Sequence, residues 1–255
     1  MHTRGKTMKV FYLGLKFSFS YFSILPVKFE EKDDLSTKPV LAAMLFFFPL
    51  VGLVLGLLTL GIYTLLEPLQ WFAALIAAVA YMMLYGFLHT EAIIDVADAL
   101  YAKHSGKDTY EIIKEPTVGA MGVLWAISML LLKVAGIIVL LMHEAYALFV
   151  STLIVSRLGL LLLFLTQDFR STFITSLQEA FKPKYFITSI ILFTTIGLFM
   201  LGWNFLLMLS LGLILSYSIA HMLKKHLGFI NGDVLGTTLE SVEILLFVGI
   251  AALWL

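Results

Sequence analysis

The chain has 255 residues, of which 60% are hydrophobic and only 13% are charged, and its Lys and Arg residues equal its Asp and Glu residues in number. Soluble domains are nearer half apolar and a quarter charged, so this composition is typical of a membrane protein. The zero net charge gives no electrostatic reason to expect a nucleic-acid partner, and the absence of cysteine excludes disulfides, thiolate catalysis and Cys-ligated metals.

The apolar segments, taken in chain order, predict an all-α bundle of about six to eight transmembrane helices. The first, residues 10–25, contains Lys16 and is either an interfacial or re-entrant helix or a further span. The last apolar stretch, at 244–255, is too short to cross the membrane unless its helix begins earlier, near Thr237. With no linker and no internal repeat, we expect one integral membrane catalytic domain over residues 1–255. The clear spans between these ends are 39–66, 71–88, 119–141, 146–165, 185–201 and 205–222.

The connections between these spans differ in charge. Those near 67–70, 143–144 and 202–204 contain no Lys or Arg, whereas the opposite connections contain several each. The positive-inside rule therefore places the basic connections in the cytoplasm. Of the 17 acidic residues, only Glu67 and Glu144 lie in the other connections. We expect a multi-pass protein of the cell (inner) membrane, with acidic helix ends and the active face on the cytoplasmic side.

The densest group of acids follows the second clear span. Glu91, Asp95 and Asp98 are four and three residues apart, so on a helix they share one face. Their mutual repulsion needs a cation to offset it, and Mg²⁺ is the natural candidate where phosphates are also bound. The alternative is a solvated polar face at a helix end, against which the apolar residues between the acids argue. We interpret the group as metal or phosphate ligands.

A second acidic group leads into the last span. Asp233 follows an Asn-Gly turn and shares a helical stripe with Gly236, Glu240 and Glu243. Acids inside an apolar helix are functional candidates, although Asp233 could instead cap the helix and leave the two glutamates exposed. Each group alone offers few ligands for Mg²⁺ and a diphosphate, so we predict that the two groups form one site.

Three basic residues are also notable. Lys114 could contact a phosphate, although an amphipathic surface helix that Pro116 breaks explains it equally well. Arg157 lies near the cytoplasmic end of its span and could reach an anionic substrate. Lys133 lies nearer the outer face, where we expect its ammonium group to snorkel to the interface.

Three of these segments resemble, in order, the sequence blocks of the cobalamin synthase family (adenosylcobinamide-GDP ribazoletransferase). Residues 89–100 resemble H-x-D-G-x-x-D-x-x-D-G, residues 111–122 resemble E-I-M-K-D-P-x-x-G-x-x-G, and residues 231–243 resemble T-G-D-x-x-G-x-x-x-E-x-x-E. The chain departs from the pattern at a few positions. These are Glu91 for Asp, Ala92 and Ala99 for Gly, Asn231 for Thr, and Ile24 for an Arg.

The resemblance implies a Mg²⁺-dependent transferase. The 5′ oxygen of α-ribazole, or of its 5′-phosphate, would attack the phosphorus joined to adenosylcobinamide, releasing GMP and forming adenosylcobalamin or its phosphate. We expect Asp95, Asp98 and Asp233 to be catalytic, and these three with Glu91 to bind the metal. The expected substrate-binding residues are His89, Lys114, Arg157, Gly232, Gly236, Glu240 and Glu243.

Two other functions are compatible with the composition. A secondary transporter would carry acids near the midplane of the membrane and two related halves, and no halves are visible. A lipid-head-group phosphotransferase usually has a D-G-x-x-A-R arrangement, and no Arg follows Asp95 or Asp98 at that spacing. The expected partners are the two small-molecule substrates and the lipid bilayer, with no nucleic acid, and a homo-oligomer is left open.

Overall fold

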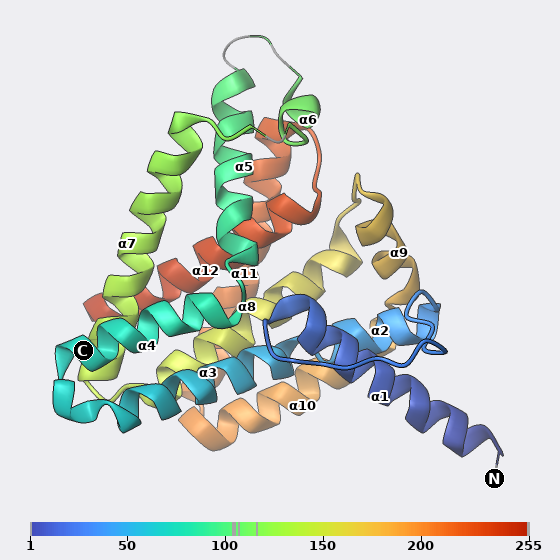
Figure 1. Cartoon of the computed structure of the whole chain (residues 1–255), viewed down its shortest axis with the longest axis horizontal. Helices are drawn as coiled ribbons and strands as arrows, with labels where there is room; N and C mark the ends of the chain where they lie inside the picture. The colour runs from blue at the N-terminus through green and yellow to red at the C-terminus, as the bar shows by residue number, and fades with distance from the viewer. Residues whose placement is uncertain (1, 104–105, 107, 116, 254–255) are drawn as a thin grey trace.

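The computed structural model describes residues 2–103, 106, 108–115 and 117–253, so Pro116 lies outside the described residues. The described residues form helices and no strand, as the composition predicts (Figure 1). The α-helices are α1 His2–Phe22, α2 Lys38–Phe46, α3 Phe48–Leu65, α4 Trp71–Leu84, α5 Leu88–Lys103, α6 Thr109–Ile112, α7 Ala120–Met142, α8 Tyr146–Thr166, α9 Thr172–Ala180, α10 Pro183–Leu201, α11 Asn204–Leu227 and α12 Gly232–Leu253, with one 3₁₀ turn, η1, at Glu67–Leu69.

Six helices, namely α3, α7, α8, α10, α11 and α12, are long and apolar enough to cross a membrane. A seventh span results if the bent pair of α4 and α5 is counted as one. These findings confirm the predicted multi-pass helical bundle. Helix α1, which covers the first apolar segment, is not among the candidate spans found in the described part of the chain.

Two predicted spans are interrupted. The segment 39–66 divides into α2 and α3 at Phe47, where Pro49 occupies the first turn of α3. The segment 71–88 ends at Leu84, because Gly86 and Phe87 both have positive φ, and α5 continues at 78° to α4. The acids at 91, 95 and 98 therefore lie on a separate helix rather than at the end of a straight span. A glycine tolerates this backbone, whereas Phe87 adopts it against its usual preference.

The last helix begins earlier than the sequence suggested, at Gly232 instead of near Thr237. As a result, Glu240 and Glu243 lie inside a candidate span, and both side chains are fully buried. The alternative that leaves them exposed is therefore wrong.

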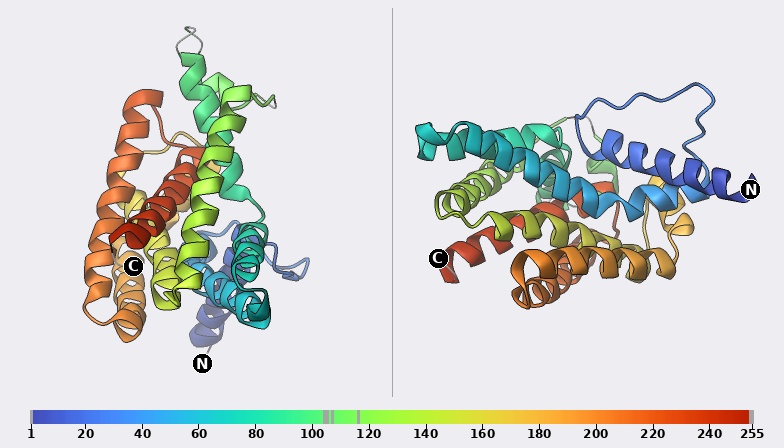
Figure 2. Two further views of the ribbon diagram at one scale, coloured as in Figure 1. Left: turned by 90° about the vertical axis from the view of Figure 1, so that its left-hand side faces the viewer. Right: turned by 90° about the horizontal axis from the view of Figure 1, so that it is seen from below.

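Helix α8 is the centre of the bundle, with 83% of its span buried inside the protein, whereas α10 buries only 17%. Figure 2 shows α8 between α3 and the pair α10 and α11. Small residues allow the close approach of α8 and α11, since a side chain at Gly159 would collide with Ser216 and one at Gly212 with Val155. The apolar outer faces of α7, α10 and α11 remain available for lipid.

The basic connections and those without Lys or Arg lie at different ends of the bundle. The turns after α3 and α7 line one hollow together, through Glu67, Gln70 and Met142. At the other end, Lys103 Nζ donates to the carbonyl of His226 at 2.5 Å, and Arg170 N–H donates to that of Ile230 at 2.8 Å. The connections that the charge pattern assigns to one side therefore contact each other.

Candidate active site

Helices α5 and α12, which carry the two acidic groups, pack directly against each other. Thr237 Oγ1 donates a hydrogen bond to the carbonyl of Ala92 at 2.9 Å, across 145 residues of sequence. A Cβ atom at Gly236 would lie 2.7 Å from the Cβ of Ala92, so only glycine permits this approach. The fold thus brings together the two segments that the sequence predicts to share a site.

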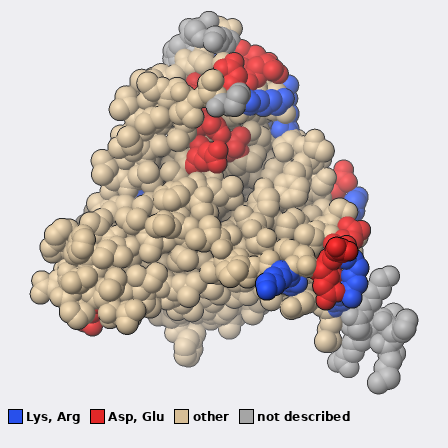
Figure 3. All heavy atoms as spheres, in the orientation of Figure 1, with Lys and Arg blue, Asp and Glu red and all other residues tan. Residues whose placement is uncertain are grey.

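Three carboxylates meet at this contact. The Asp95 carboxyl group interacts electrostatically with Asp233 and Glu91, and Asp233 interacts in turn with Glu91. Glu91 is exposed, and Asp95 and Asp233 are partly buried. No ion pair between described residues includes any of the three, so their negative charge is uncompensated within that part of the protein. Figure 3 shows acidic atoms gathered beside a hollow in this face.

Asp233 is oriented by the residue that begins its helix. Asn231 Oδ1 accepts the N–H of Val234 at 3.0 Å, which caps α12, and Asn231 Nδ2 donates to Asp233 Oδ2 at 2.7 Å. The capping role that the sequence left open for Asp233 therefore belongs to Asn231. The second carboxylate oxygen of Asp233 has no hydrogen bond to another described side chain and can accept a ligand.

Asp98 is engaged differently. Its two oxygens accept the backbone N–H groups of Gly119, at 2.5 Å, and Gly122, at 2.7 Å, at the N-terminus of α7. The positive end of the α7 dipole stabilises this carboxylate. A side chain at Gly122 would lie 2.7 Å from Asp98 Oδ2, so the glycines make room for it. In this structure Asp98 holds α7 against α5, whereas Asp95 and Asp233 have free oxygens.

Glu91, Asp95 and Asp233 have the oxygen donors that Mg²⁺ prefers, but they do not form a complete coordination site by themselves. No group of three or more His, Cys, Asp or Glu side chains within the described ranges has metal-binding geometry. Mg²⁺ usually keeps several waters and binds through one or two carboxylates together with substrate phosphates. Glu91, Asp95 and Asp233 supply this type of donor on one open surface.

Lys133 is not at the interface, which corrects the prediction that its ammonium group snorkels. The side chain is fully buried, and Nζ lies 2.6 Å from Glu240 Oε2 and 2.8 Å from Glu243 Oε2. Arg157 is also buried, at 1% exposure, and its Nη1 donates to Glu243 Oε1 at 2.5 Å. Two cations and two anions thus form a neutral network inside the bundle. Burial of each charge is tolerated because the opposite charges are in direct contact.

Hydrogen bonds extend this buried network toward α5. The Tyr81 hydroxyl donates to Glu243 at 3.0 Å, Lys133 Nζ donates to the Tyr85 hydroxyl at 3.4 Å, and that hydroxyl contacts Thr90 Oγ1 at 2.9 Å. The network therefore fixes the bend between α4 and α5. The sequence assigns Arg157, Glu240 and Glu243 to substrate binding, but the structure places them away from the described pockets, in contact with each other and with Lys133.

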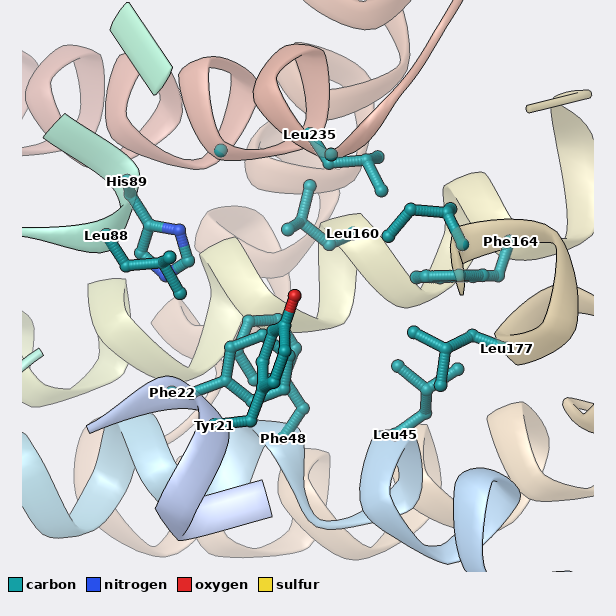
Figure 4. A pocket seen from close by; sticks show the side chains of 13 residues that line it. Tyr21, Phe22, Leu45, Phe48, Leu88, His89, Leu160, Phe164, Leu177 and Leu235 are labelled. Carbon is teal, nitrogen blue, oxygen red and sulfur yellow. The ribbon is translucent and has the colours of Figure 1, made fainter. Parts of the chain in front are cut away.

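An apolar pocket opens below the acidic cluster and contains His89. The pocket has a volume of about 100 Å³. Its wall is mostly aromatic and aliphatic, with Phe22, Phe48 and Leu160 among the lining residues (Figure 4). His89 is 5% exposed, and its Nε2 atom has no hydrogen-bond partner among the described residues. The Tyr85 ring stacks on the imidazole, with ring centroids 5.5 Å apart.

The mouth of this pocket is polar and carries two cations that flank one ring. Arg170 lies 3.6 Å and Lys114 Nζ 3.9 Å from the centroid of Tyr110. Both cations line a second hollow together with Asp233 and Tyr21. The pKa of the Tyr21 phenol is raised, first by burial and then by the negative charge of Asp233. The mouth thus brings the Asp233 carboxylate and two cationic side chains into one opening.

Arg170 is a site residue that the sequence reasoning missed. It entered the sequence analysis only as one of the charges that set the orientation of the helices. Its position directly after the fourth clear span, on the same side as the acids, was the available signal. By contrast Lys114, Gly232 and Gly236 were predicted, and all three line the two connected hollows.

Comparison with known proteins places the chain among enzymes of cobalamin synthesis. The model of the cobalamin-5-phosphate synthase family matches residues 14–251. An adenosylcobinamide-GDP ribazoletransferase of Clostridium perfringens (strain SM101) is 33% identical, covering 96% of this chain and 99% of its own length. Proteins of the same name from Pseudomonas syringae pv. syringae (30% identical, 96% and 100% covered) and Brevibacillus brevis (28%, 93% and 98%) are similar. No solved structure matches the chain.

Proposed function

The chain belongs to the cobalamin-5-phosphate synthase family, and on this premise we propose that it is an adenosylcobinamide-GDP ribazoletransferase. It joins α-ribazole, or its 5′-phosphate, to adenosylcobinamide-GDP with release of GMP. The observation that carries the proposal is the family match over nearly the whole chain, including both acidic segments. The relatives named above bear the same activity in their names.

The geometry of the mouth supports this chemistry. The 5′ oxygen of α-ribazole 5′-phosphate is already esterified, so the attacking group common to both substrates is another hydroxyl of the ribose. This hydroxyl must lose a proton, and Asp95 or Asp233 has a carboxylate oxygen that could accept it. Arg170 and Lys114 supply positive charge for the diphosphate of the second substrate. Because Asp233 and the two cations lie in one hollow, a hydroxyl and a phosphorus can be held side by side. The bond that forms joins a ribose oxygen to the phosphorus attached to adenosylcobinamide. The bond that breaks is the one from that phosphorus to the bridging oxygen of the diphosphate, which leaves with GMP.

We include Mg²⁺ in the proposal, held by Glu91, Asp95 and Asp233. When bound it would neutralise charge on the nonbridging phosphate oxygens during the displacement. Among the described acids of the α5–α12 contact, these three carboxylates differ from Asp98, which binds the amides of α7, and from Glu240 and Glu243, which are paired with buried cations. Asp98 belongs to the proposed site through its effect on the position of α5.

The alternative functions are not favoured. The family match and the names of the relatives point to a transferase rather than to a transporter or a lipid-head-group phosphotransferase. The acids that lie deep in a span, Glu240 and Glu243, are paired with Lys133 and Arg157. Such neutral pairs do not offer the free carboxylate that a proton-coupled or cation-coupled carrier requires.

The activity and its metal dependence are tested in one assay. Purified protein in detergent or lipid, given adenosylcobinamide-GDP and α-ribazole with Mg²⁺, is expected to form adenosylcobalamin and GMP, detected by chromatography. EDTA should abolish turnover and added Mg²⁺ should restore it, because the three carboxylates lack another cation. Absence of product with Mg²⁺ present contradicts the proposed function. Full turnover after removal of metal contradicts only the role of Mg²⁺.

We further propose that the acidic mouth faces the cytoplasm of the cell, as the positive-inside rule indicates. The chain has no cysteine, so single cysteines report sidedness without background. With Asn204→Cys, a membrane-impermeant maleimide should label intact cells or spheroplasts. With Ser36→Cys, which is exposed at the opposite, basic end, labelling should require permeabilised membranes. Labelling of both variants in intact spheroplasts would show that this orientation is wrong.

A further inference from the structure

The apolar pocket around His89 differs in chemistry from the charged mouth that it joins. The mouth carries Lys114, Arg170 and Asp233, whereas the pocket below it is lined mainly by Phe, Leu and Ile side chains. Tyr21 and Gly232 line both hollows, so the two lie directly beside each other. A ligand that fills both must therefore have a flat apolar part and a polar or charged part.

The polar groups inside the pocket are few. His89 Nε2 is buried without a hydrogen-bond partner among the described residues. The Tyr21 hydroxyl points into the space between His89 and Leu160 (Figure 4). A buried polar atom without a partner is unfavourable. The imidazole that carries this atom lines the pocket, so a ligand in the pocket is placed to complete the hydrogen bonding of the ring.

The two substrates of the proposed reaction carry different ring systems. Guanine has several donors and acceptors around its edge, and most of them would lose hydrogen bonds to water in this pocket without finding new partners. The base of α-ribazole is a benzimidazole that carries two methyl groups. Only one of its ring nitrogens is free to accept a hydrogen bond. That nitrogen can accept a hydrogen bond from the imidazole N–H of His89, and the methyl groups can pack against the apolar wall.

We propose, on the basis of the proposed function, that this pocket holds the dimethylbenzimidazole ring of α-ribazole, with the His89 imidazole donating to the free ring nitrogen. The ring lies among Phe22, Phe48 and Leu160, and the ribose extends past Gly232 into the mouth. This arrangement directs the ribose hydroxyls toward Asp233 and leaves Arg170 and Lys114 to the diphosphate of the other substrate. His89 thereby favours a base with a free ring nitrogen, and the apolar wall favours its methyl groups.

The assignment of the pocket is tested by measuring, with one enzyme preparation, how strongly the enzyme prefers one base over another. The kcat/KM is measured for the α-ribosides of 5,6-dimethylbenzimidazole and of unsubstituted benzimidazole, each with saturating adenosylcobinamide-GDP. Leu160→Phe narrows the pocket where the methyl groups are placed, so it should lower the ratio of the two kcat/KM values at least about tenfold. The ratio is independent of the fraction of folded enzyme. Leu131→Phe, on the exposed face of α7, is the matched control and should leave the ratio unchanged.

A second variant covers the case in which Leu160→Phe does not fold. His89→Ala should raise the KM for α-ribazole at least about tenfold and leave the KM for adenosylcobinamide-GDP within about twofold. If wild-type enzyme is active but neither variant changes base selectivity or the KM for α-ribazole, the assignment of the pocket is wrong. A rise in the KM for adenosylcobinamide-GDP alone would assign the pocket to that substrate instead. Lack of wild-type turnover with either riboside contradicts the proposed function itself.

Discussion

Replacing Asp95 or Asp233 by asparagine is expected to reduce kcat at least about 100-fold, or roughly 3 kcal/mol of transition-state stabilisation. Both carboxylates lie at the α5–α12 contact and interact electrostatically. Asparagine keeps the size of the side chain but removes the charge that would hold a cation and the oxygen that would accept a proton. The rate of GMP release from the purified variants measures the loss.

The double variant Asp95→Asn/Asp233→Asn tests whether the two residues act as one unit. Groups that serve one step are strongly non-additive, so the double variant should be scarcely slower than either single variant. Asp34→Asn, an exposed acid in the loop before α2, is the control and should retain wild-type turnover. If the fold-reduction in kcat of the double variant equals the product of the two single reductions, the acids of α5 and α12 act independently.

Asp98→Asn should behave differently from both. Its carboxylate accepts two backbone N–H groups of α7, and an asparagine amide can accept through one oxygen only. The expected loss therefore includes thermal stability, whereas Asp95→Asn should leave the melting temperature nearly unchanged. This difference separates a residue that positions α5 from one that contacts the substrate.

Breaking the buried charge network is expected to have the largest effect on stability. Lys133→Met leaves Glu240 and Glu243 to share the single charge of Arg157 inside the bundle. Removing one partner of a buried ion pair destabilises a protein by about 3 to 5 kcal/mol, because the other charge stays buried and uncompensated. We expect poor recovery of folded protein and a much lower temperature of aggregation in detergent.

A double variant of the same network tests whether the loss of stability comes from the charge imbalance. Lys133→Met/Glu240→Gln removes one cation and one anion, so the remaining Arg157–Glu243 pair is again neutral. This double variant should recover much of the stability that Lys133→Met loses. Lys38→Met removes the exposed partner of Glu179 and should change stability by no more than about 1 kcal/mol. A double variant no more stable than Lys133→Met would show that packing, rather than charge, explains the loss.

Several features of the site could be predicted from the sequence because they depend only on residues that are close together along the chain. The repeat of acids on α5 requires only that residues 88–103 be helical, and their shared face follows from the helical period. The turn before Asp233 and the tolerance of close approach at Gly236 follow from local backbone preferences. That α5 and α12 meet was inferred from the number of ligands each could offer, and the structure confirms the contact.

Other features depended on which helix faces which. The depth of Lys133 in its span could be estimated from the sequence, but its direction around the helix axis could not. In the structure it points to Glu240 and Glu243 on α12, so it is buried instead of snorkelling. Likewise, nothing in the sequence near Asp98 indicated that the amides of Gly119 and Gly122 would occupy its oxygens.

The sequence by itself determined that this is a multi-pass helical membrane protein, which family it resembles and which acids to consider. Apolar composition and short motifs are local properties, and a bilayer leaves helices few alternatives. The tertiary structure alone decided how the polar residues divide. Glu91, Asp95 and Asp233 have no ion-pair partner among the described residues, whereas the two glutamates of α12 and the two buried cations neutralise one another in the core. That division depends on distances between residues far apart in the chain. A carboxylate is available to a substrate only where the packing of other helices leaves it without a partner.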